Sequence, residues 1–144
     1  MGTFSAAVSA KVQARKDMLA AVFRQSVQDI AEIAQTPGPS VFNPGGGRGG
    51  HMPIGETGFL RASFTATLGT PPAKRDNPGK ATSYDPGPIS LVIAGADIGD
   101  TVTLAWTAAY ARHVHRRYQW AALAAQRWES VVAENTRKAE AMLK

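Results

Sequence analysis

Apolar residues recur at steps of three, four and seven over the first 35 residues of the chain. That spacing places them on one face of an α-helix and predicts a single helix over residues 1–35. Thr3 or Ser5 can cap its start, and Pro37 stops it because proline lacks the amide donor that a helix needs. Most charged residues fall on the other face. The apolar face comprises Val8, Val12, Leu19, Val22, Phe23, Val27, Ile30 and Ile33.

The length of this helix carries a further expectation. A continuous helix of about thirty residues is about 45 Å long, which is more than one small domain covers. We therefore expect part of the helix to pack on another subunit. The alternative is a helix that is broken in its middle.

Residues 36–54 are a predicted loop, because glycine and proline dominate them and no hydrophobic period survives. The glycine-rich run Gly45–Gly50 superficially suggests a phosphate cradle. No Lys-Ser/Thr pair follows it and no strand precedes it, so it meets neither the P-loop pattern nor the dinucleotide-binding pattern. A flexible loop is the interpretation that we adopt.

The rest of the chain is arranged around the stretch from Gly55 to Phe64. Gly55 and Gly58 permit tight backbone geometry there. From Leu60 to Leu68 apolar and polar residues alternate, which is the period of a half-buried strand. Residues 69–88 follow as a loop too long for a hairpin turn, and we predict that it is mobile in the free protein and ordered on assembly.

Two further runs, Ile89–Ala94 and Thr101–Trp106, are rich in β-branched residues and flank a glycine-containing turn. They predict an antiparallel hairpin of two strands. Tyr110–Arg117 leads out of the sheet, and helical spacing over 120–144 predicts a C-terminal helix packed on the sheet. Residues 55–119 would then hold the sheet, and the whole chain of 144 residues is expected to be one α+β domain.

Composition narrows the class of protein. Apolar content of 44% and charged content of 19% are typical of a folded globular chain. The absence of cysteine excludes disulfides and thiolate metal sites, and suits a reducing cytoplasm. No apolar run approaches the roughly 20 residues of a membrane helix, and no signal-peptide layout is visible. The net charge of +5 favours anionic neighbours such as nucleic acid or acidic protein, or merely aids solubility.

Candidate catalytic chemistry is sparse. His113 and His115, with His51, are the only metal-like grouping, but no carboxylate or cysteine completes a ligand shell and neighbouring arginines would repel a cation. Ser63 or Ser90 could be paired with a histidine, yet no nucleophile elbow accompanies either serine. We therefore predict no enzyme activity, no metal and no cofactor.

The segment Tyr110–Trp120 is the richest in candidate binding residues. It holds three arginines, two histidines and three aromatic residues with no acid. That mixture suits phosphate contact with base stacking. It also suits a protein–protein hot spot, where Arg, Tyr and Trp dominate, and this is the interpretation that we favour. The third alternative is a solvated rim whose aromatic residues face the core.

Two motifs carry a family resemblance. The family pattern P-x-D-T-G-x-L-R-x-S corresponds to Pro53–Ser63, with one extra residue after the proline and Glu56 where aspartate is usual. The family pattern Y-A-x-x-x-E-x-G corresponds to Tyr110–Arg117, where the expected acid and glycine are missing. With the helical start, these pieces resemble the head–tail joining or tail-completion proteins of long-tailed bacteriophages, similar to the minor tail protein Z group. The resemblance covers most of the chain from Gly55 onward.

The resemblance implies a structural role in the virion. Copies would form a homo-oligomeric ring in the phage neck, complete the tail and join it to the head connector, with DNA passing through the lumen. Connector, adaptor or stopper proteins would be neighbours on one side, and tail tube or terminator proteins on the other. The protein would be in the host cytoplasm during assembly and in the virion neck afterwards. A tail terminator ring, a connector stopper ring and a basic nucleic-acid-binding module are the alternatives.

The resemblance also directs attention to particular residues. The first helix and the segment Tyr110–Trp120 are expected to supply much of the contact between ring subunits. Arg61 would either pair across the joint or anchor its own turn. Basic residues of the second loop, Lys74, Arg75 and Lys80, would face the DNA channel. The expected interface residues are Arg61, Tyr110, Arg112, His115, Arg116, Arg117, Tyr118 and Trp120.

Overall fold

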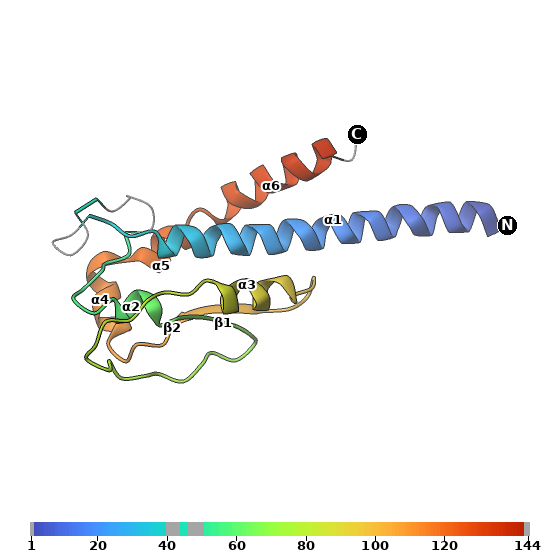
Figure 1. Ribbon diagram of the computed structural model, residues 1–144. Helices are drawn as coiled ribbons and strands as arrows, with labels where there is room; N and C mark the ends of the chain where they lie inside the picture. Colours follow the sequence, from blue (N-terminus) through green and yellow to red (C-terminus); the bar gives the residue numbers. More distant parts are fainter. Residues whose placement is uncertain (1, 40–43, 46–50, 143–144) are drawn as a thin grey trace.

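The computed structural model describes residues 2–39, 44–45 and 51–142 (Figure 1). It confirms the α+β class: a long N-terminal helix, a small antiparallel sheet and a helical C-terminal region. The elements in chain order are α1 (Gly2–Gln35), α2 (Phe59–Ala62), β1 (Phe64–Leu68), α3 (Gly87–Ala94), β2 (Val102–Trp106), α4 (Ala111–Tyr118), α5 (Trp120–Ala125) and α6 (Trp128–Met142).

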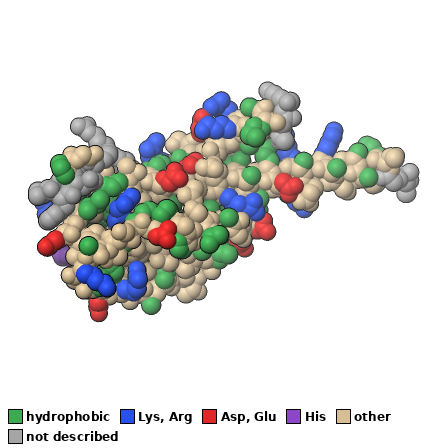
Figure 2. All heavy atoms as spheres, viewed as in Figure 1, with side chains coloured by type: hydrophobic (Ala, Val, Ile, Leu, Met, Phe, Trp, Pro, Cys, Tyr) green, Lys and Arg blue, Asp and Glu red, His purple; other side chains and the backbone are tan. Residues whose placement is uncertain are grey.

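Helix α1 is one unbroken helix of 34 residues, as its apolar stripe predicts, and a break in its middle is excluded. It ends where the sequence indicates, with the Thr36 hydroxyl donating to the Glu32 carbonyl oxygen at 2.7 Å just before Pro37. Residues 3–17 are all exposed, whereas burial begins at Met18. The N-terminal part of α1 therefore projects beyond the body of the molecule as an arm (Figures 1 and 2).

The sheet has two strands, and its pairing differs from the predicted hairpin. Strand β1 pairs antiparallel with β2 in a register that joins Phe64 to Trp106 and Leu68 to Val102. The predicted strand Ile89–Ala94 is instead part of helix α3. A short apolar run does not distinguish a buried strand from a buried helix. Here Pro88 stands in the first helical turn, where proline favours a helix.

The start of the predicted strand Leu60–Leu68 is also helical. Phe59–Ala62 forms the single turn α2, and the strand begins at Phe64. Gly58 precedes this turn with a φ of 70°, a conformation that glycine adopts without strain. The Ser63 hydroxyl donates to the Leu60 carbonyl oxygen at 2.6 Å, which satisfies a carbonyl at the end of the turn.

The C-terminal region is a series of three helices. The segment predicted to lead out of the sheet contains helix α4, and the closing helix predicted over 120–144 is divided into α5 and α6. Its last two residues lie outside the described part. Gln119, with a φ of 50°, forms the corner between α4 and α5. Helix α6 packs along α1, so the contact of this region with the sheet is made by Trp120 of α5 against Trp106.

Two hydrophobic clusters form the core, and α1 contributes to both. One cluster lies where α1 ends and combines Ala34 and Met52 with α2 and Trp120. The other lies between the middle of α1, the sheet and α3, around Val27 and Phe64. Phe64 and Trp106 stack with ring centroids 4.7 Å apart, and Trp106 packs against both clusters. The core is therefore continuous along the second half of α1.

The loop over residues 69–88, for which we predicted mobility, is tied to the body at two points. The Arg75 amide donates to the Thr107 carbonyl oxygen, and the Ala109 amide donates to the Arg75 carbonyl oxygen at 2.7 Å. Further along, the Thr82 amide donates to the Thr57 carbonyl oxygen at 2.7 Å. The loop thus contacts both the end of β2 and the turn before α2.

Candidate functional site

The Gly55–Phe64 stretch joins the end of α1 to the sheet through Gln35 and Arg61. The Gln35 side-chain amide donates to the Arg61 carbonyl oxygen at 2.8 Å, and Arg61 Nε donates to the Gln35 carbonyl oxygen at 2.9 Å. Gln35 Oε1 also accepts from Trp106 Nε1 at 2.7 Å. The Arg61 guanidinium lies 4.9 Å from the centre of the Tyr84 ring. Of the two roles expected for Arg61, anchoring its own turn is the one that these contacts describe.

Two more residues of the same motif hold the backbone. A Cβ added at Gly58 would lie 3.0 Å from the Thr82 carbonyl oxygen, so the close approach of the loop leaves no room for a side chain. The Ser63 carbonyl oxygen accepts from both the amide and the hydroxyl of Thr107 at 3.0 Å. The motif that carries the family resemblance is therefore the junction of α1, α2, β1, β2 and the loop.

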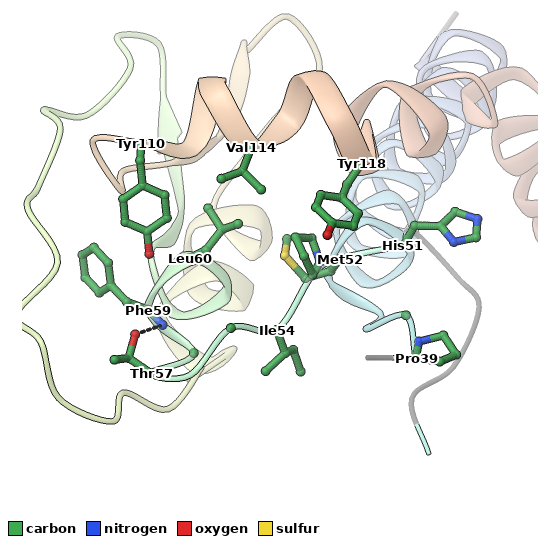
Figure 3. A pocket seen from close by; sticks show the side chains of 14 residues that line it. Pro39, His51, Met52, Ile54, Thr57, Phe59, Leu60, Tyr110, Val114 and Tyr118 are labelled. Carbon is green, nitrogen blue, oxygen red and sulfur yellow. Dashed lines mark hydrogen bonds between the residues drawn. The ribbon is translucent and has the colours of Figure 1, made fainter. Parts of the chain in front are cut away.

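An apolar groove of about 640 Å³ lies beside this junction (Figure 3). Helix α4 supplies one wall through Tyr110, Val114 and Tyr118. The stretch before α2 and α2 itself supply the rest, with Met52 and Phe59 among the lining residues. Burial raises the pKa of the Tyr110 phenol above its ordinary value. Among the described residues no carboxylate, lysine or arginine lines the groove, so it offers aliphatic and aromatic contact more than acid–base chemistry.

The predicted binding segment Tyr110–Trp120 separates into an inner and an outer face in the structure. On the inner face, His115 Nε2 accepts from the amides of Ala121 and Ala122 at 3.2 and 3.3 Å and so caps the start of α5. Trp120 is 1% exposed and packs edge-on against Trp106. Both residues were expected at a subunit interface. The structure buries Trp120, which is therefore inaccessible to a partner, and leaves His115 half-buried.

The outer face of α4 carries the cations. Arg112, His113, Arg116 and Arg117 are exposed, whereas Val114 and His115 on the opposite side are half-buried. Because residues one, four and five positions apart share a helix face, these four side chains form one surface, which we call the α4 basic face. The ion pairs found in the described part of the chain do not include any of its arginines. Tyr118, 41% exposed, lies at its border.

The loop cations expected to face a DNA channel are exposed, but one of them, Arg75, makes contacts within its own chain. Arg75 Nε donates to the Thr107 hydroxyl at 3.0 Å, and its guanidinium lies 5.6 Å from the centre of the Phe59 ring. Lys74 and Lys80 are exposed and have no ion pair among the described residues. Arg75 therefore ties the loop to its own chain.

The arm of α1 is the other exposed surface with a distinct pattern. Phe4, Val8 and Val12 are 78%, 44% and 48% exposed. Val8 and Ser26 are separated by about five helical turns and so point in the same direction. Ser26 is fully buried and accepts a hydrogen bond from Asn135 of α6 at 3.1 Å. The face of α1 that α6 covers thus continues uncovered along the arm.

Residues with hidden structural roles were missed by the sequence analysis. Gln35, Ser26 and Met52 are 2%, 0% and 0% exposed, and Asn135 is buried against α1. Asn135 Nδ2 also donates to Asp29 Oδ2 at 2.9 Å, which makes it the polar clamp between α6 and α1. The signal available for Asn135 was its position on the apolar face of the predicted closing helix, where a polar residue needs a partner.

The remaining candidates from the sequence are not brought together. His113 is exposed and His115 is turned inward, and no group of three or more potential metal ligands occurs within the described ranges. The Ser63 hydroxyl is bonded to a carbonyl oxygen, and the Ser90 hydroxyl lies 3.4 Å from Gln28 Oε1. The glycine run Gly45–Gly50 falls mostly outside the described residues. None of the helices that the structure describes has the length and apolarity needed to span a membrane.

Comparison with known proteins gives no further identification: no family model, curated protein or solved structure matches the chain.

Proposed function

We propose that this chain is a structural protein of the neck of a long-tailed bacteriophage, where copies form a ring that completes the tail and joins it to the head connector. DNA passes through the lumen of this ring. The proposal begins from the two motifs that resemble the tail-completion family. The geometry supports it because the first motif, Pro53–Ser63, forms the junction that organises the fold.

The observation that carries the proposal is the arm of α1. Its apolar residues Phe4, Val8 and Val12 extend the face that α6 covers further along the same helix, yet they are exposed in the single chain. Side chains of this size stabilise a protein by about 1.5–3 kcal/mol each when they are fully buried. A ring supplies a neighbour for the arm of every subunit, because one surface of each copy meets a different surface of the next.

The positive charge of the arm argues against two arms pairing with each other. Lys11, Arg15 and Lys16 are exposed, and no acidic residue precedes Asp17. Two arms side by side would bring like charges together, which is unfavourable. The arm is therefore better suited to the body of the next subunit than to a second arm, and a head-to-tail contact of this kind forms a ring when its rotation closes.

Native mass spectrometry tests the proposal. The full chain is measured alone, with purified tails of the virus, and with its portal-bearing heads. A ring of the protein alone, or a monomer that becomes a ring on these particles, supports a neck role. A monomer that remains unchanged with both particles contradicts it. Preference for tails over heads separates tail completion or a terminator from a connector stopper.

A further inference from the structure

We propose that the α4 basic face binds the phosphate backbone of duplex nucleic acid. That this duplex is the DNA in the ring lumen rests on the function proposed above, whereas binding itself needs only the single chain. The binding residues are Arg112, Arg116 and Arg117, with His113 as an additional donor.

The first observation is the separation of charge from apolar surface on α4. In the sequence, arginines and aromatic residues are mixed within this segment, which suits either a protein hot spot or base stacking. In the structure, Trp120 is buried, and Tyr110 packs against the Phe59 ring with centroids 6.3 Å apart. The outer face is left with cations, and Tyr118 at its border is the one aromatic side chain of α4 itself. Backbone phosphates are neutralised by cations alone, whereas unpaired bases need aromatic platforms.

The second observation is the absence of acidic residues from the segment of sequence that holds this face. From Thr101 to Trp128 the sequence contains four arginines and no aspartate or glutamate. Arg15, Arg24 and Arg137 are different, because each lies within 4.0 Å of a carboxylate. The guanidinium groups of α4 therefore remain available for an external anion, and phosphate oxygens accept their paired N–H groups well.

An acidic protein surface is the competing partner. Stable protein interfaces have an apolar centre surrounded by a polar rim. The α4 basic face has no such centre, because Val114 and the Tyr110 ring point into the groove on the opposite side of the helix (Figure 3). Apolar surface suited to a protein partner is found in that groove and on the arm of α1, which lies at the other end of the molecule (Figure 1). The α4 basic face is therefore suited to a different kind of partner from these apolar surfaces.

The test is fluorescence anisotropy of a labelled random-sequence DNA duplex titrated with the full chain at several salt concentrations. We compare the wild type with Arg112→Gln/Arg116→Gln/Arg117→Gln. Each phosphate contact contributes about 0.9 to the log–log dependence of affinity on salt, so losing three contacts lowers the slope by about 2.7. When salt is raised from about 50 to about 200 mM, the wild type should therefore lose roughly 40-fold more affinity than the triple variant.

The matched control removes the same charge from the arm: Lys11→Gln/Arg15→Gln/Lys16→Gln. It should retain wild-type DNA affinity and slope. Equal weakening by both triple variants would show that only net charge matters and would overturn the assignment to α4. Absence of DNA binding by the wild type at low salt would also overturn it, and loss of assembly in the α4 variant would then identify the face as a protein interface.

The failure of this inference is distinguishable from failure of the proposed function. DNA affinity is measured on the purified chain, whereas ring formation is measured on tails and heads. A protein that binds duplex through α4 but never assembles retains the α4 assignment and loses the neck role. A protein that assembles but does not bind duplex keeps the neck role and loses the α4 assignment.

Discussion

Gln35 and Arg61 exchange hydrogen bonds in both directions, side chain to backbone, across the junction between α1 and α2. Gln35 is 2% exposed and also accepts from the Trp106 indole. Three elements distant in sequence are therefore fixed by one amide. Arg61 belongs to the motif Pro53–Ser63, so its presence there is explained by the fold before any partner is considered.

The first prediction concerns this amide. Gln35→Ala leaves the partly buried Arg61 carbonyl oxygen and Trp106 N–H without their partner, and we expect a loss of about 2–3 kcal/mol in the free energy of unfolding. Urea unfolding followed by tryptophan fluorescence measures it. Gln25→Ala is the control, because Gln25 is exposed on the same helix and bonds to Asp29 at the surface. That variant should change stability by less than about 0.5 kcal/mol. Equal losses would contradict the role of Gln35.

A second prediction concerns the clamp between α1 and α6. Asn135→Ala should destabilise the protein by about 1–2 kcal/mol, because it removes two hydrogen bonds from a buried site. Ser26→Ala and the double variant complete a mutant cycle. We expect a coupling energy above about 0.5 kcal/mol, since the two side chains are in contact. Strict additivity would show that the hydrogen bond at 3.1 Å contributes no stability.

The third prediction concerns Trp120 and separates the contribution of its ring packing to stability from that of its indole N–H. Its indole N–H is buried and has no hydrogen-bond partner among the described residues. Trp120→Phe keeps an aromatic ring and removes that N–H, so it should cost less than half as much as Trp120→Ala. The alanine variant should lose about 3–5 kcal/mol in the free energy of unfolding. Equal losses measured by urea unfolding would mean that the N–H is needed.

The arm of α1 gives a fourth prediction. Phe4→Ser/Val8→Ser/Val12→Ser should unfold at the same urea concentration as the wild type, because these side chains are exposed in the single chain. The same variant should fail to form rings on tails or heads. Native mass spectrometry and thermal unfolding give the two readouts.

The matched control for the arm changes its opposite side. Ala6→Ser/Ala10→Ser/Gln13→Ser introduces the same residue type at exposed positions about half a turn away from the apolar stripe. It should assemble normally. Assembly of both variants would remove the arm from the subunit contact.

The fifth prediction concerns alkaline pH. Burial raises the pKa of Tyr84 above 10.0, although Arg61 and the hydrogen bond with Gln35 oppose this shift. The folded state holds the phenol proton more tightly than the unfolded chain does. This contribution to stability is complete below pH 10.0 and is lost as the pH rises through the folded-state pKa.

The measurement is urea unfolding at a series of pH values on either side of 10. We expect the wild type to lose stability more steeply than Tyr84→Phe over the alkaline part of the series. Tyr84→Phe lacks the ionisable group, so its curve isolates the contribution of this residue. Parallel curves would contradict a raised pKa.

The sequence predicted α1 well because its determinants are local. A stripe of apolar residues and a terminating proline specify a helix without reference to the rest of the chain. Ile89–Ala94 was misassigned because six mostly apolar residues fit either a strand or a helix, and packing on β1 and α1 decides between them. The strand alternation in 64–68 and 102–106 was recognised. Their pairing was not, because a contact between distant segments leaves no local signal.

The candidate site shows the same limit. The composition of Tyr110–Trp120 identified a segment that combines cations and aromatic residues. It could not show which side chains face outward, because that required helix α4 and the sharp corner at Gln119. The inward orientation of His115 and Trp120 follows from the start of α5 being packed on the sheet. Gln35 and Asn135 were missed because their partners lie 26 and 109 positions away.

The clamp between Ser26 and Asn135 also has a consequence for how the protein is made. Helix α1 leaves the ribosome before α6 does, and Asn135, which covers Ser26, is synthesised 109 residues after it. During that interval the stripe is exposed to water and to other chains, which invites premature association. We therefore expect chains interrupted before α6 to aggregate more readily than the complete chain.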